Sequence, residues 1–119
     1  MANPLNILEK LENIVEQDAR YNLDAYSFVL EALNYTVRSL KKSRHVTGRE
    51  LLEGIKQYAK AQFGPLAHTV LEHWGLSQTQ DFGHIVFNLV EAKILSKTEE
   101  DSIEDFKNGY DFKEVFGEK

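Results

Sequence analysis

Apolar residues recur every three or four positions along most of this chain, and this spacing is the feature that most constrains its fold. Because an α-helix turns once in about 3.6 residues, residues spaced in this way share one face of a helix. The most regular stretch begins at Asn22 or Asp24 and ends at Lys41 or Lys42. Its apolar face consists of Tyr26, Val29, Leu30, Leu33, Val37 and Leu40. The spacing predicts a helix there with one face against a core.

Start and stop signals divide the rest of the chain into further helices. The clearest is a capping box, in which the Thr47 hydroxyl accepts from the Glu50 amide and the Glu50 carboxylate accepts from the Thr47 amide. The helix that follows ends at Gly64-Pro65, because proline cannot continue the backbone ladder. Similar signals predict helices from Asn3-Pro4 to about residue 20 and over residues 66–74. A fifth helix begins at a second capping-box spacing, Ser77 to Gln80, and continues to about residue 90.

Residues 94–110 allow two interpretations. Either the acidic stretch 98–101 caps a helix, or residues 94–97 and 102–106 form two strands joined by the turn 99–101. The order helix, turn, helix and two strands is that of a winged helix-turn-helix, so we favour the strands. The sequence then predicts a mainly α fold of about five helices, with a winged-helix-like C-terminal half and a short β-ribbon. Apolar residues near the end predict that the tail folds back onto the body: Phe112, Val115 and Phe116.

The length of 119 residues and the 42% hydrophobic composition fit one domain with one core. We expect a single domain over residues 1–119, with a helical part over 1–64 and a winged-helix-like part over 65–119. No apolar stretch approaches the roughly 18 residues that cross a bilayer, and the charged N-terminus does not resemble a secretion signal. The chain has no cysteine, which excludes disulfides and thiolate chemistry. These features predict a cytoplasmic protein with no membrane partner.

The net charge of −5 is unevenly distributed. Residues 97–119 carry four lysines and eight acids, whereas a basic run comprises Arg38, Lys41, Lys42, Arg44, His45 and Arg49. Cations near a helix C-terminus complement the helix dipole and need no ligand. Alternatively, the run binds an acidic partner, which could be RNA, a nucleotide phosphate, another protein or the acidic tail of a second copy. DNA binding by a winged helix is disfavoured, because the acids at 99–101 would repel phosphates.

Three aromatic residues lie off the main apolar stripes of their predicted helices: Phe28, Tyr35 and Phe87. Such residues indicate either a helix that is buried on two sides or a surface that contacts a partner. The candidate partner surface therefore combines charged and aromatic residues, namely Arg38, Lys41, Lys42, Arg44, Arg49, Phe28, Tyr35 and Phe87.

No motif indicates catalysis or metal binding. His68 and His73 are five residues apart and do not share a helix face, and the chain has no phosphate-binding loop, nucleophile elbow or serine–histidine signature. We therefore assign no catalytic, cofactor-binding or metal-binding residue and expect no cofactor. A small enzyme remains an alternative; its pocket would lie near Trp74, His73 and His84.

Four long segments, at residues 21–36, 44–67, 70–75 and 81–106, resemble a family of small bacterial proteins found in Planctomycetes, Verrucomicrobia and related genomes. The resemblance covers nearly the whole chain. It implies that the chain is a complete, bacterial and cytoplasmic unit in which residues 81–106 belong to the shared architecture. The family has no assigned activity, so the resemblance transfers no site residue to these positions.

The sequence as a whole favours a non-enzymatic protein-interaction domain that binds either a second copy of itself or another protein. One alternative is a nucleic-acid-binding, winged-helix-like protein that uses the basic run 38–49. The other is an enzyme with an unrecognised pocket.

Overall fold

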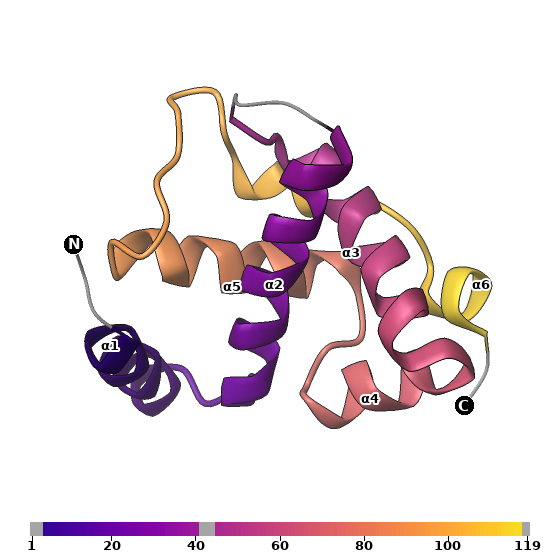
Figure 1. Cartoon of the computed structure of the whole chain (residues 1–119), viewed down its shortest axis with the longest axis horizontal. Coiled ribbons are helices and arrows are strands. Elements are labelled where there is room, and N and C mark those ends of the chain that lie inside the picture. The colour runs from indigo at the N-terminus through magenta and orange to yellow at the C-terminus, as the bar shows by residue number, and fades with distance from the viewer. Residues whose placement is uncertain (1–3, 41–44, 118–119) are drawn as a thin grey trace.

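The fold is mainly helical, as predicted. The computed structural model describes residues 4–40 and 45–117 (Figure 1). Within these ranges lie α1 (Pro4–Gln17), α2 (Leu23–Leu40), α3 (Gly48–Phe63), η1 (Gly64–Leu66), α4 (Ala67–His73), α5 (Thr79–Glu91), η2 (Ile103–Phe106) and α6 (Phe112–Phe116), where η marks a 3-10 helix. The first five α-helices lie close to the ranges that the apolar spacing predicts. None of the helices in the described ranges is long and apolar enough to span a membrane.

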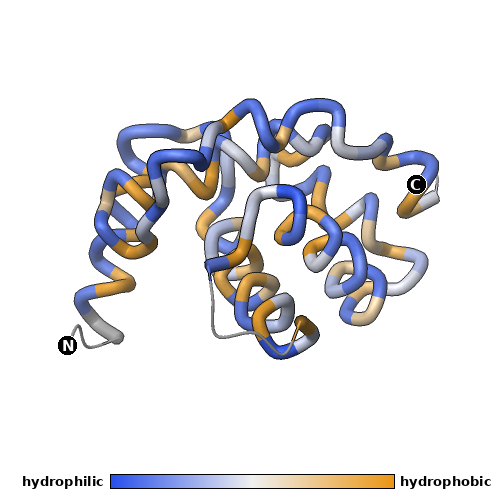
Figure 2. The backbone as a smooth tube through the Cα atoms, turned by 90° about the horizontal axis from the view of Figure 1, so that it is seen from above, coloured by the Kyte–Doolittle hydropathy of each residue, from blue (hydrophilic) through white to orange (hydrophobic). Residues whose placement is uncertain are grey.

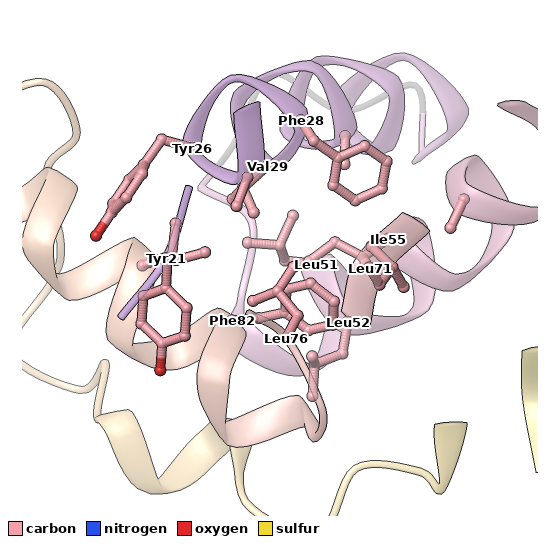
Figure 3. Close-up of a cluster of buried hydrophobic side chains, with 14 of the residues drawn as sticks. Tyr21, Tyr26, Phe28, Val29, Leu51, Leu52, Ile55, Leu71, Leu76 and Phe82 are labelled. Atoms are coloured by element: carbon pink, nitrogen blue, oxygen red, sulfur yellow. The ribbon is translucent and has the colours of Figure 1, made fainter. Parts of the chain in front are cut away.

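The α2 and α3 helices lie side by side at the centre of the molecule, α5 crosses behind α2, and α4 and α6 flank α3 (Figure 1). Hydrophobic and hydrophilic residues alternate along each helix, as amphipathic packing requires (Figure 2). The buried side chains of α2, α3, α4 and α5 form one cluster (Figure 3). The close approach of α2 and α3 depends on Gly54, because a Cβ there would overlap the buried Thr36 hydroxyl.

The capping box at the start of α3 is confirmed. The Thr47 Oγ1 atom accepts from the Glu50 amide at 3.1 Å, and Glu50 Oε1 accepts from the Thr47 amide at 3.0 Å. The predicted box at α5 is displaced by one residue, because the N-cap is Gln78 rather than Ser77 and the N3 residue is Asp81 rather than Gln80. The acid that caps this helix is Asp81, not Gln80, since its carboxylate accepts from the amides of Ser77 and Gln78. An ionised carboxylate satisfies the free N–H groups of a helix start better than a neutral amide does.

The segment after α5 differs from both predictions. The described residues 94–106 contain neither the two expected strands nor a helix over 98–110, so the β-ribbon of the predicted wing is missing from this segment. Residues 103–106 instead form η2. The Ser102 hydroxyl accepts from the Glu104 amide at 3.1 Å, and the Asp105 carboxylate accepts from the Ser102 amide at 3.2 Å. These local caps start a turn of 3-10 helix where strand pairing was expected.

Two glycines admit the Phe106 ring into the core. A Cβ on Gly83 of α5 would lie 2.9 Å from Phe106 Cβ, and one on Gly48 of α3 would lie 3.1 Å from Phe106 Cε2. The ring is only 3% exposed. The tail also folds back as predicted, because Phe112 and Phe116 of α6 are buried. Residues 102–116 therefore complete the core of the helices that precede them.

Candidate binding site

An apolar pocket of about 270 Å³ opens among α2, α5, the start of α3 and the segment 95–106. Binding sites in proteins are typically concave and mostly apolar, with a few polar groups at fixed positions. Polar side chains stand at the edge of this one, among them His45, Lys97 and Asp101. The apolar wall is made by Leu33, Val37, Val46, Leu51, Val86, Phe87, Val90, Leu95 and Phe106.

The helices supply the pocket wall in pairs of residues spaced by four. Leu33 and Val37 lie on one face of α2, and Val86 and Val90 lie on one face of α5. All four side chains are half-buried, whereas Leu51 and Phe106 beneath them are buried. The pocket therefore has an apolar floor that belongs to the core and apolar walls that solvent reaches.

One ion pair stands at the mouth of the pocket. His45 Nε2 lies 2.6 Å from Asp101 Oδ2, and the same carboxylate oxygen accepts from the Thr98 amide at 2.8 Å. Burial raises the pKa of the Asp101 carboxyl, but the Thr98 amide and His45 outweigh this and lower its pKa below the usual value. The carboxylate therefore stays ionised at neutral pH and can hold an imidazolium at His45.

Of the three off-stripe aromatic residues, only Phe87 lines the pocket. Phe28 is 3% exposed, and its ring lies 5.6 to 5.7 Å from those of Tyr58, Phe63 and Trp74. It lies in the core, so it is not part of a partner surface; α2 is buried on two sides at this point. Tyr35 is half-buried against Tyr58, with ring centroids 5.4 Å apart.

Two residues of the basic run contact the C-terminal segment in the part of the run that the structure describes. His45 pairs with Asp101, and Arg49 Nη2 donates to the Lys107 carbonyl at 3.3 Å. Arg38 is exposed near the end of α2. The remaining predicted cations, Lys41, Lys42 and Arg44, lie outside the described residues. The C-terminal end of the basic run, at His45 and Arg49, therefore lies beside residues 101–107.

A second polar cluster joins the α1–α2 connection to α5, and sequence reasoning missed it. The Tyr21 hydroxyl donates to Asp81 Oδ1 at 2.7 Å, and His84 Nδ1 lies 2.7 Å from the same hydroxyl oxygen. Arg20 Nη1 lies 3.3 Å from the same Nδ1 atom of His84, so the cluster also reaches the guanidinium. Burial, followed by the hydrogen bond to Asp81, raises the pKa of the Tyr21 phenol, which stays protonated. About sixty positions separate these residues, and no local pattern links them.

The residues of the predicted enzyme pocket do not converge. Trp74 packs between Phe28 and Phe63, His84 contacts Tyr21, and His73 is exposed. Within residues 4–40 and 45–117, no group of three histidine or acidic side chains could hold a metal ion. The apolar pocket is therefore the best-formed candidate site in the described structure.

Comparisons with known protein families, curated proteins and solved structures return no match for this chain. The arguments for function therefore depend on the pocket and its surroundings.

Proposed function

We propose that this chain is a non-enzymatic protein-interaction domain whose apolar pocket receives a large apolar side chain from a partner protein. The observation that carries the proposal is the half-buried apolar wall formed by α2 and α5. Apolar surface that stays open to water is costly, and a partner that covers it gains the corresponding free energy. The proposal does not depend on a winged-helix-like C-terminal half.

The edge of the pocket favours a polypeptide as its occupant. It offers cationic and hydroxyl donors, such as Lys97 and Thr47, together with the carboxylate acceptors Asp101 and Asp105. A peptide backbone presents both N–H and C=O groups around each side chain, so it can use a mixed edge of this kind. An apolar centre with a polar rim is also the usual anatomy of a protein–protein interface. A second copy of this chain is the first partner to test.

The experiment compares the wild type with Val86→Glu, which places a charge on the pocket wall, and with Val70→Glu, which places the same charge on a half-buried position of α4. Each is used to select binders from a displayed peptide library. Its solution mass is measured by light scattering over a range of concentrations. We expect wild type and Val70→Glu to select peptides with a shared large apolar residue. We expect Val86→Glu to bind these peptides at least about tenfold more weakly than the wild type does.

A concentration-dependent dimer that Val86→Glu abolishes and Val70→Glu retains would identify the partner as a second copy. Selected peptides that bind Val86→Glu as tightly as wild type would refute the pocket as the docking site. Circular dichroism of both variants verifies that they are folded.

A further inference from the structure

We infer that residues 96–101, here called the strap, regulate access to the apolar pocket, and that the His45–Asp101 ion pair latches the strap when His45 is protonated. The inference rests on the proposed function, because it concerns access to the same pocket. It adds a regulatory input, pH, that the proposed function does not require.

The strap spans the gap between two anchored points. Leu95 before it is half-buried against the core, and Phe106 after it is buried between Gly48 and Gly83. In Figure 1 the orange segment after α5 rises from the end of that helix to the level of the C-terminal end of α2. Ser96, Lys97 and Asp101 line the pocket. Movement of the strap would therefore widen or narrow the pocket without disturbing the core.

Few interactions hold the strap to the body. Residues 96–100 are all exposed, and their hydrogen bonds in the described structure stay within the strap. The Lys97 ammonium donates to the Thr98 carbonyl, the Thr98 amide donates to Asp101, and the Asp101 amide donates back to the Thr98 carbonyl. The contact between Asp101 and His45 connects the strap to the opposite edge of the pocket. A segment with these properties opens locally at low free-energy cost.

Carboxylates outnumber cations among the described charged groups that line the surface around His45. Asp101 lies at 2.6 Å, and Glu100 and Asp105 line the adjoining depression together with the cation Arg49. The pocket side contributes Lys97. Three carboxylates and two cations of the described residues therefore line this surface, and the Asp101 carboxylate is in direct contact with His45. Opening the strap removes that carboxylate from the imidazolium.

The direction of the pH dependence follows from the charges of the two side chains of the ion pair, His45 and Asp101. Histidine is the side chain that changes charge between about pH 5 and 8, whereas the Asp101 carboxyl, whose pKa is lowered, stays ionised over that range. The ion pair exists only while His45 carries its proton. The latch is therefore closed at mildly acidic pH, where an imidazole carries its proton, and weakens at mildly alkaline pH, where an imidazole is neutral. The pocket becomes more accessible on the alkaline side.

The test measures binding of Nile red, a neutral dye whose fluorescence rises in apolar surroundings, at pH 5.5 and pH 8.0. A neutral probe is needed because a charged dye would respond to His45 directly. We expect the wild type to bind Nile red about two- to fivefold more tightly at pH 8.0, the range set by a partly exposed ion pair. His45→Gln should bind equally at both pH values, and the control His73→Gln, which alters an exposed histidine on α4, should behave like the wild type.

Asp101→Asn supplies a second variant from the other side of the pair. It keeps an acceptor for the Thr98 amide and removes the charge, so its binding should also be independent of pH. A pH dependence that survives in both His45→Gln and Asp101→Asn would overturn the inference.

Hydrogen exchange distinguishes failure of the latch from failure of the pocket. We expect the protection factors of the amides of residues 96–101 to be lower at pH 8.0 than at pH 5.5 in the wild type, and equal at both in His45→Gln. Absence of Nile red binding at either pH would contradict the proposed function, and the latch would then be judged by exchange alone. Equal protection of the strap in the wild type at the two pH values would refute the latch.

Discussion

The two sides of α2 lie in different surroundings. On one side, Phe28 is enclosed by Tyr58, Phe63 and Trp74 from α3 and the end of α4. On the opposite side, Val37 faces a pocket that solvent enters. We call these the closed side and the open side. The sequence alone does not separate them, because it places aromatic or branched residues on both.

The neighbours that cover each side account for the difference. The closed side is covered by helices whose aromatic rings interlock at centroid distances between 5.4 and 5.7 Å. The open side is covered by the strap, which consists of polar residues and cannot fill an apolar gap. Regular helices present rows of side chains that fit one another, whereas an exposed polar loop does not. A pocket therefore forms where a loop takes the place of a helix.

The largest expected effect concerns the closed side. Phe28→Ala should lower the free energy of unfolding by about 3 to 5 kcal/mol, because a buried ring is removed and its neighbours cannot all collapse into the space. Urea denaturation followed by circular dichroism measures the change. A loss below about 1 kcal/mol would show that the closed side is as loosely packed as the open side.

The next largest effect concerns Gly83, against which Phe106 packs to anchor the chain after the strap. Gly83→Ala should cost about 1 to 2 kcal/mol, although alanine favours helix, because its Cβ would lie 2.9 Å from Phe106 Cβ. A double-mutant cycle with Phe106→Leu should reveal coupling between the two sites. If Gly83→Ala were more stable than wild type, the close contact between α5 and η2 would be disproved.

An effect of similar size is expected for the aromatic residue of the pocket itself. Phe87→Ala should destabilise the fold by about 1 to 2 kcal/mol, less than Phe28→Ala, because the Phe87 ring is only half-buried. Its effect on binding should be larger than its effect on stability. Comparing Nile red affinity with the urea midpoint tests this. Equal losses of stability from the Phe28 and Phe87 substitutions would remove the distinction between the two sides.

The smallest effect concerns the ion pair between Arg20 and Asp18, which belongs to neither side of α2. The hydrogen bond from Arg20 lowers the pKa of the Asp18 carboxyl; burial raises it, and the amide of Asn88 lowers it further. Because the folded state lowers this pKa, the stabilisation is present above about pH 4 and is lost as the pH falls further. Arg20 is half exposed, so solvent screening limits the effect.

Between pH 5 and pH 3, Arg20→Gln should therefore lose less stability than the wild type, by about 0.5 kcal/mol. Urea denaturation at several pH values measures the difference. Parallel pH profiles for the two proteins would indicate that this pair contributes no measurable stability.

Much of the fold is predictable because helices carry their signals locally. Both halves of the capping box at Thr47 lie within four residues, and the stop at Gly64-Pro65 is equally local. The folded-back tail follows from its apolar residues. The segment 94–106 is not predictable in this way. Its caps at Ser102 and Asp105 start a 3-10 turn, and its few apolar residues are not spaced regularly enough to favour either a helix or a strand.

The candidate site is less predictable than the fold. Phe28 and Phe87 carry the same sequence signal, yet the first completes an aromatic cluster and the second lines a pocket. The Tyr21–Asp81–His84 cluster has no signal at all, because Tyr21 lies about sixty positions from Asp81 and His84 in the chain. Local spacing describes one helix face and contains no information about which element covers it.

The sequence by itself determined the approximate limits and the apolar faces of the first five α-helices. The reason is that helix periodicity, caps and breakers act over distances of about four residues. Only the tertiary structure decided that Phe106 enters between two glycines, that the strap covers a pocket, and that His45 meets Asp101. These outcomes depend on which surfaces meet after the helices have formed, and that choice is made by packing among residues far apart in the chain.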